Sequence, residues 1–159
     1  MEVEFDVRMN TGVLFDYMLN HAYKSFSGIF WTFACIIFIF ISLRASSVMY
    51  TIIGLIALLY MPVNLYIASR RRMLLVPAFK KPLHYRLCDQ GVFMSQEEVS
   101  QNFEWDKITK AISTSRSIIL YTDKNIATIL PREDMGDMTT EAVRIISSHV
   151  DPKKVRIRY

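Results

Sequence analysis

The side chains that most often carry out catalysis or bind metals are few and scattered in this sequence. Its three histidines, His21, His84 and His149, fall in three different predicted elements, and none has metal-ligand spacing with a cysteine or a carboxylate. The two cysteines, Cys35 and Cys88, fall in an apolar run and at a strand end, so we expect no disulfide between them. Motifs of serine hydrolases, P-loop NTPases, zinc proteases and dinucleotide-binding enzymes do not occur. We therefore expect neither enzymatic activity nor a bound metal or cofactor.

Acidic residues could form a general acid and base only where they occur close together. The candidate pairs are Glu97 with Glu98, Glu104 with Asp106, and Glu133 with Asp134. All three fall at predicted turns, where neighbouring carboxylates are usually solvated strand ends. We interpret them as surface charges and not as catalytic groups.

Five basic residues form the charged cluster that suggests a binding role. They are Arg70, Arg71, Arg72, Lys80 and Lys81, and no acidic residue lies between them. Residues 83–159 hold eleven basic and eleven acidic residues, so the whole net charge of +4 lies upstream. A nucleic-acid-binding domain would carry its basic surface on the folded module, which argues against a nucleic-acid partner. Contact with anionic lipid headgroups, worth about 1 kcal/mol per basic residue, fits this cluster better.

Two uncharged apolar runs, residues 26–43 and 48–68, precede this cluster. At about 1.5 Å per helical residue they would be roughly 27 and 31 Å long, close to the thickness of the hydrocarbon core of a bilayer. The alternative, two buried helices of a soluble protein, would need more surrounding chain than 159 residues provide. We therefore expect residues 26–68 to form a transmembrane helical hairpin.

The orientation of this hairpin follows from the basic residues at its ends. The turn, residues 44–47, holds one of them, Arg44, whereas the basic cluster follows the second run. The positive-inside rule then places both chain termini in the cytoplasm. We expect a multi-pass protein of the cytoplasmic membrane, in which residues 69–82 form a basic juxtamembrane linker.

Pro62 and Asn64 interrupt the second apolar run. Proline removes a backbone hydrogen bond and clashes with the carbonyl four residues earlier, so we expect a kink near residues 58–62. The Asn64 amide is expected at the membrane interface, because Ser69 and the arginines follow closely. No ionisable residue lies inside either run, which argues against a substrate or ion pathway.

Residues 1–25 are predicted to form a strand and an amphipathic helix. Val3, Phe5 and Val7 alternate with charged neighbours, which is the period of a half-buried strand. A helix with an apolar stripe then begins at Thr11, whose hydroxyl can cap it.

Residues 83–159 are predicted to form a cytoplasmic domain of six short strands and a helix over residues 138–150. The predicted fold class is α+β membrane protein: a two-helix transmembrane hairpin plus a small antiparallel β-barrel or sheet, capped by a C-terminal helix. This order of elements is that of a pleckstrin-homology-like (PH-like) domain. Trp105 and Pro131 are expected to be structural, with the Trp105 indole in the core.

The chain resembles the YcxB-like family of small bacterial membrane proteins. The resemblance rests on three stretches, YRLCDQGVFMS, FEWDKITKAIST and SIILYTDKNIATILPRED, and on the strand, helix, hairpin and basic linker before them. It implies a bacterial cytoplasmic membrane and a PH-like cytoplasmic domain. The family has no established biochemical activity, so the resemblance implies a fold and a location, not a mechanism.

The final stretch, residues 155–159, departs from the simplest version of that fold. Its apolar residues alternate with arginines, whereas Glu2, Glu4 and Asp6 form an acidic face on the first strand. Opposite charges across a strand pair contribute about 0.2–1 kcal/mol each. We hypothesise that residues 155–159 pair with residues 3–7; the alternative is a frayed basic tail on the membrane surface.

Two functions agree with these features. The first is a non-catalytic interaction, scaffold or regulatory module, held on anionic lipid and binding a protein or peptide partner, for instance by strand addition. The second is immunity against a membrane-active toxin or bacteriocin, in which the hairpin itself, with Pro62, Asn64, Ser46 and Ser47, makes the contact. A homo-oligomer is compatible with either function.

Overall fold

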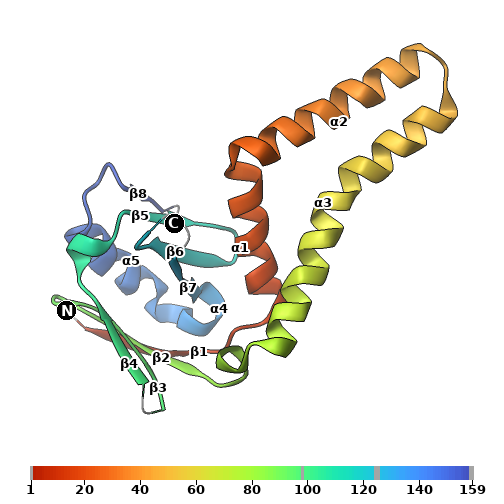
Figure 1. The fold of residues 1–159 in the computed structure, drawn as a ribbon. Coiled ribbons are helices and arrows are strands. Elements are labelled where there is room, and N and C mark those ends of the chain that lie inside the picture. The colour runs from red at the N-terminus through yellow and green to blue at the C-terminus, as the bar shows by residue number, and fades with distance from the viewer. Residues whose placement is uncertain (1, 98, 124–125, 158–159) are drawn as a thin grey trace.

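The computed structural model describes residues 2–97, 99–123 and 126–157, and it has an α+β fold in two parts (Figure 1). One part is a pair of long helices that projects away from the rest of the molecule. The other is a module of two four-stranded sheets with a helix between them. A further helix, α1, joins the two parts.

The projecting part consists of α2 (Phe26–Arg44) and α3 (Val48–Leu75). The most apolar 18-residue windows of these helices have mean hydropathies of 2.3 and 1.9, and both helices are long and apolar enough to span a membrane. Helix α3 continues through Pro62 and beyond Ala68, so the first residues of the expected linker are helical. A short 3₁₀ helix, η1 (Pro77–Lys80), follows before the chain enters the sheets.

Helix α1 (Thr11–Lys24) packs on one sheet of the module. Its N-cap is Asn10 and not Thr11, because the Asn10 side chain accepts a 2.8 Å hydrogen bond from the Val13 amide. Asn is as good an N-cap as Thr, and here it stands at the last extended position before the helix. Val13 and Leu14 are buried against Ile129 of the sheet below.

Sheet A has the order β1-β2-β3-β4 and is antiparallel throughout. Its strands are β1 (Val3–Val7), β2 (Leu83–Cys88), β3 (Gly91–Gln96) and β4 (Val99–Phe103). The apolar side chains of β1 and β2 alternate into the core. The first strand therefore completes the sheet that begins after the hairpin, and the folded module draws on both sides of residues 26–68.

Sheet B has the order β7-β6-β5-β8. Its strands are β5 (Lys110–Ser113), β6 (Ser117–Tyr121), β7 (Ala127–Pro131) and β8 (Val155–Arg156). The hypothesis that the C-terminal stretch pairs with β1 is wrong for the part that the structure describes. Val155 and Arg156 run parallel to β5, opposite Ala111 and Ile112. Arg158 and Tyr159 lie outside the described residues.

The acidic face of β1 pairs instead with β2, where Glu4 lies opposite Arg86 and Asp6 opposite His84. The Asp6 carboxylate lies 2.8 Å from His84 Nδ1. Opposite charge did not identify the partner of β1, because Arg86 of β2 faces the acidic side of β1 as an arginine of the C-terminal stretch would have done.

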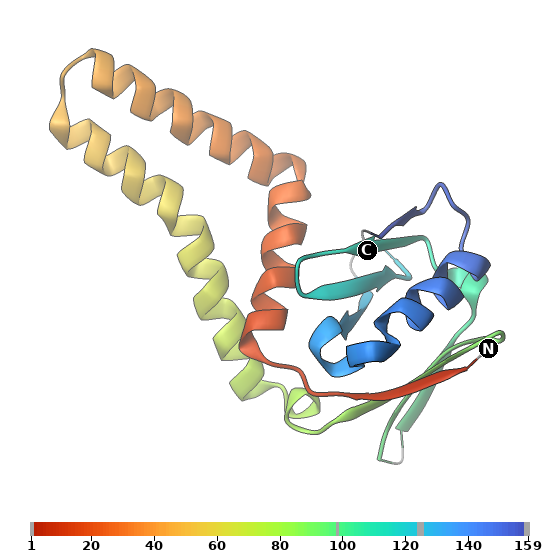
Figure 2. The same cartoon turned by 180° about the vertical axis from the view of Figure 1, so that it is seen from behind.

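The core lies between the two sheets, around helix α5 (Thr139–His149) (Figure 2). Short helices α4 (Arg132–Met135) and η3 (Gly136–Met138) lead into α5, and η2 (Trp105–Lys107) connects the sheets. The largest fully buried side chains include Leu87, Ile118, Leu130, Ile145 and Ile146. The predicted strands and terminal helix are present, but the strands form two separate sheets and not a closed barrel, because α5 fills the space between them.

Candidate functional site

Small side chains hold α2 and α3 together. The buried residues of α2 are Gly28, Cys35 and Ser42, spaced at intervals of seven, and they form one seam along the helix. At the far end of the hairpin the Ser42 and Thr51 hydroxyls lie 3.0 Å apart. Small residues let two helices approach closely where no hydrophobic driving force brings them together.

The contacts across this seam show which turns of α2 and α3 lie side by side, that is, at the same height along the hairpin. Trp31 Nε1 donates a 3.3 Å hydrogen bond to the Ala57 carbonyl, and a Cβ added to Gly28 would lie 3.2 Å from Met61 Cε. The first turn of α2 therefore lies beside Met61. Helix α3 continues well beyond this height, and its lower part packs against α1, where Tyr66 meets Phe15 edge to face at 5.7 Å.

The predicted headgroup residues lie on this lower part. Arg70, Arg71 and Arg72 are exposed on the last turns of α3, and nine residues separate Met61 from Arg70, which is about 13 Å along a helix. Lys80 is exposed in η1, and Lys81 forms an ion pair with Glu97. The structure thus separates the arginines from the first turn of α2.

Other residues from the sequence interpretation lie elsewhere on the hairpin. Arg44 ends α2, with its guanidinium 5.6 Å from the centre of the Phe40 ring. Pro62 lies inside α3, and Asn64 is exposed on the next turn, just below the height at which α2 begins. The structure does not bring these three residues together with the basic cluster.

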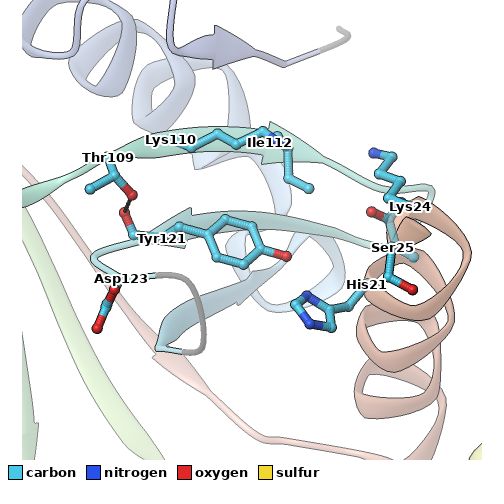
Figure 3. Close-up of a pocket in the computed structure, with 9 residues that line it drawn as sticks. His21, Lys24, Ser25, Thr109, Lys110, Ile112, Tyr121 and Asp123 are labelled. Atoms are coloured by element: carbon cyan, nitrogen blue, oxygen red, sulfur yellow. Dashed lines mark hydrogen bonds between the residues drawn. The ribbon is translucent and has the colours of Figure 1, made fainter. Parts of the chain in front are cut away.

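A cavity of about 560 Å³ lies between the last turns of α1 and the outer face of sheet B (Figure 3). Nine residues line it: Asn20, His21, Lys24 and Ser25 from the end of α1, and Thr109, Lys110, Ile112, Tyr121 and Asp123 from sheet B and its loops. It exists because α1 covers β6 and β7 but leaves the β5 side open. None of the residues predicted from the sequence lines it.

Two lining residues of this cavity, His21 and Tyr121, are aromatic, and Tyr17 packs beside them. Tyr17, His21 and Tyr121 lie with ring centres 6.1–6.5 Å apart. Burial raises the pKa of Tyr121 to about 12, and the neighbouring Tyr17 adds to the shift. Burial also raises the pKa of Tyr17, against an opposing effect of Arg72. Both phenols are therefore neutral at pH 7 and add no negative charge to the cavity. The charged residues that line it are Lys24, Lys110 and Asp123.

A second cavity, of about 760 Å³, adjoins the first and shares Asn20 and Lys24 with it. Its basic residues besides Lys24 are Arg132 and Arg156. The end of α1 thus lies over a concave surface with basic side chains on both sides. One feature of the sequence points to this site. Lys24 is the last charged residue before the first apolar run, and basic residues are common next to membrane spans.

No metal centre accompanies these cavities. In the part of the chain that the structure describes, no group of three or more His, Cys, Asp and Glu side chains is close enough together to hold a metal ion. The arrangement can bind an anion or an amphiphile.

Residues 89–144 match the family model described as YcxB-like protein. This stretch of the chain is YcxB-like. The predicted resemblance is confirmed over these residues, which run from the β2–β3 turn into α5 and include Lys110 and Tyr121 of the cavity. No curated protein and no solved structure gives a significant match to the chain.

Trp105 and Pro131 lie inside the YcxB-like segment. The Trp105 side chain is buried, donates a 3.0 Å hydrogen bond to the Cys88 carbonyl and stacks on His149 with ring centres 5.2 Å apart. Pro131 ends β7 and is the N-cap of α4. Both occupy structural positions away from the cavity.

The YcxB-like segment also contains the open edge of sheet A. Strand β4 has no charged residue, and nearly all of it is exposed, including Val99 at 64%. Among the described residues, no other strand pairs with its outer side. Such an edge presents unpaired backbone donors and acceptors to a partner.

Proposed function

We propose that the protein is a non-catalytic interaction module, anchored in the bacterial cytoplasmic membrane by α2 and α3. One observation supports the anchoring best: most large apolar side chains of both helices point outward, and no described residue covers them. Only 17% of the most apolar window of α2 is buried, and 6% of that of α3. Large exposed apolar surfaces of this kind are rare in soluble monomers and are normal in lipid.

The distribution of charge supports an orientation with both ends of the chain in the cytoplasm. Arg44 stands at the tip of the hairpin, whereas Arg70, Arg71 and Arg72 stand at its base together with the sheets. Basic residues next to membrane spans are retained on the cytoplasmic side. In this orientation the two-sheet module lies under the inner leaflet, where anionic lipid attracts it.

The module itself is proposed to be PH-like. Support comes from the succession of antiparallel strands followed by a helix that packs in the core. The division of its strands into two separate sheets and the parallel pairing of β8 are departures from a simple PH barrel. Fold alone does not transfer the lipid specificity of other PH domains, so the ligand has to be argued from this chain's own residues.

Strand β4 is the proposed contact for a protein partner. An extended peptide could add to its open edge by backbone hydrogen bonds, and the side chain of Val99 would supply apolar contact. The polar residues Ser100, Gln101 and Asn102 keep the free edge soluble until a partner is present.

Cysteine labelling tests the anchoring and the orientation together. In a background without Cys35 and Cys88, Ser47→Cys at the hairpin tip should react with a membrane-impermeant maleimide in intact cells. Ser115→Cys in the module should react only after the membrane is opened. Labelling of both sites in intact cells, or release of the protein by alkaline carbonate, would overturn the proposal.

Photo-crosslinking in living cells tests the interaction surface. A photoreactive amino acid at Ser100 on β4 should give one discrete adduct with a second protein, whereas the same group at exposed Glu141 on α5 should not. An adduct formed instead at Ser46, with a peptide toxin and only when that toxin is supplied, would support the immunity role and remove the adaptor role.

A further inference from the structure

We infer that the cavity under the end of α1 is a binding site for one anionic phospholipid, with the headgroup phosphate held by Lys24 and Lys110 and a headgroup hydroxyl held by Asn20. This inference rests on the proposed anchoring of α2 and α3 in the membrane. It assigns the lipid contact to a defined site, in place of a general attraction to the bilayer surface.

The cavity lies where the first membrane helix begins. Ser25, which lines it, is both the C-cap of α1 and the N-cap of α2. Phe26 and Phe30 follow on α2, 85% and 66% exposed, with their rings stacked 6.5 Å apart. A lipid whose headgroup lies in the cavity would therefore have its acyl chains at the level of the first, exposed turns of α2.

The charges of the lining suit a phosphate. Lys24 comes from α1 and Lys110 from β5, so the two cations approach the cavity from different elements (Figure 3). The His21 ring lies near the hydroxyl end of Tyr121, and Asp123 lies near the backbone end of the same tyrosine (Figure 3). Hydrogen bonds between a cation and a phosphate are about twice as strong as neutral ones.

Asn20 adds a requirement for a hydrogen-bond donor on the ligand. Its Oδ1 atom is buried, and within the described residues it has no hydrogen-bond partner. A buried acceptor of this kind is normally satisfied. The glycerol hydroxyls of phosphatidylglycerol would satisfy it, whereas phosphatidic acid offers a phosphate without such a hydroxyl.

The arginines at the base of α3 are less well placed for this contact. They lie about 13 Å below the turn of α3 that faces the start of α2, and electrostatic attraction is screened over about 8 Å at physiological ionic strength. Arg72 instead acts on the Tyr17 phenol. The arginines therefore fix orientation and add a general attraction, while Lys24 and Lys110 bind the headgroup.

The test uses the full-length protein in phosphatidylcholine nanodiscs with a small fraction of phosphatidylglycerol, and native mass spectrometry of the lipid that stays bound. The wild type should retain one phosphatidylglycerol, and the double variant Lys24→Gln, Lys110→Gln should retain it about tenfold less. The matched control Lys153→Gln, Lys154→Gln removes the same charge from exposed positions outside the cavity and should bind as the wild type does.

Further arms identify the ligand chemistry. Asn20→Leu should lower retention of phosphatidylglycerol and leave that of phosphatidic acid unchanged. Inorganic phosphate alone should not displace the lipid; displacement at low millimolar concentration would show a soluble anion site and overturn the lipid assignment. Equal retention by the wild type and by Lys24→Gln, Lys110→Gln would also overturn it. A protein that does not enter nanodiscs at all would refute the membrane anchoring instead.

Discussion

The hairpin and the two-sheet module use the same apolar residues in opposite ways. In the module, Leu120 and Ile145 are 1% and 0% exposed and meet other side chains, whereas Leu59 and Ile56 on α3 are 58% and 63% exposed. Inside the module, burial from water drives the packing. Within the hairpin, which we propose to lie in lipid, close approach at small residues would replace that drive. Residue type alone therefore does not say how a side chain contributes to stability; its surroundings do.

Truncation of a matched pair of leucines should give the largest difference between the two parts. Leu120→Ala should lower the free energy of unfolding of the module by about 2–5 kcal/mol, because it leaves a cavity in the core. Leu59→Ala, on the exposed side of α3, should change it by less than about 0.5 kcal/mol. Urea unfolding in micelles, followed by Trp105 fluorescence in a Trp31→Phe background, measures both. Equal losses would mean that the hairpin surface is covered by protein.

Enlarging the seam should separate the hairpin helices. A Cβ at Gly54 would lie 2.6 Å from Ile39 Cγ1, so Gly54→Leu should destabilise the helix pair by about 1–3 kcal/mol. The measurement is the rate of disulfide formation between Ser42→Cys and Thr51→Cys, in a background without the natural cysteines; it should fall. Ala34→Leu on the exposed face of α2 is the control. An unchanged rate in Gly54→Leu would contradict the seam.

Helix α1 connects the two parts. Its N-cap residue, Asn10, should contribute more to the stability of the helix than Thr11, the residue that follows. Asn10→Ala removes the hydrogen bond to the Val13 amide and should cost about 0.5–2 kcal/mol. Thr11→Ala should be nearly neutral. The exchange rates of the backbone amides in the first turn of α1 measure this difference in both variants. Faster exchange in Thr11→Ala alone would show that Thr11 is the N-cap, as expected from the sequence.

Replacement of Asp134 should give the smallest change in the free energy of unfolding, and this change should depend on pH. Burial raises its pKa above 3.8, although the Arg8 amide donates to it at 3.0 Å and opposes the shift. Because the folded state favours the protonated acid, its contribution to stability is full below pH 3.8 and is lost as pH rises through the folded pKa.

The variant Asp134→Asn keeps an acceptor and cannot ionise. Its stability relative to the wild type should therefore increase as pH rises from about 3 to 6. Urea unfolding across this range, with Glu141→Gln as the exposed control, measures the difference. A difference that shrinks with rising pH would show that the hydrogen bond from Arg8 outweighs burial.

Local patterns predicted most of the elements but not their ends or partners. The alternation in residues 3–7 and 83–88 predicted β1 and β2, because one face of each strand is buried. The extension of α3 to Leu75 was missed, since a change from apolar to basic residues marks a change of solvent and not the end of a helix. The partner of β8 was missed because two residues carry too little pattern to specify a partner.

The cavity could not be predicted from spacing. Its lining comes from residues 20–25 and 109–123, which only the packing of α1 on sheet B brings together. Lys24 could be suspected from its place before an apolar run. Lys110 gave no sign, because an exposed lysine at the start of a strand usually has no function beyond solubility.

The pairing of β1 with β2 has a consequence for how the protein is made. The ribosome produces β1 first, and its partner appears only after both long helices have been synthesised. Sheet A therefore cannot be completed until the hairpin has left the ribosome. Strand β1 has no partner strand while α2 and α3 are being synthesised. With α2 and α3 in a bilayer, as we propose, a chain whose two hairpin ends lay on opposite sides of the membrane could not complete sheet A.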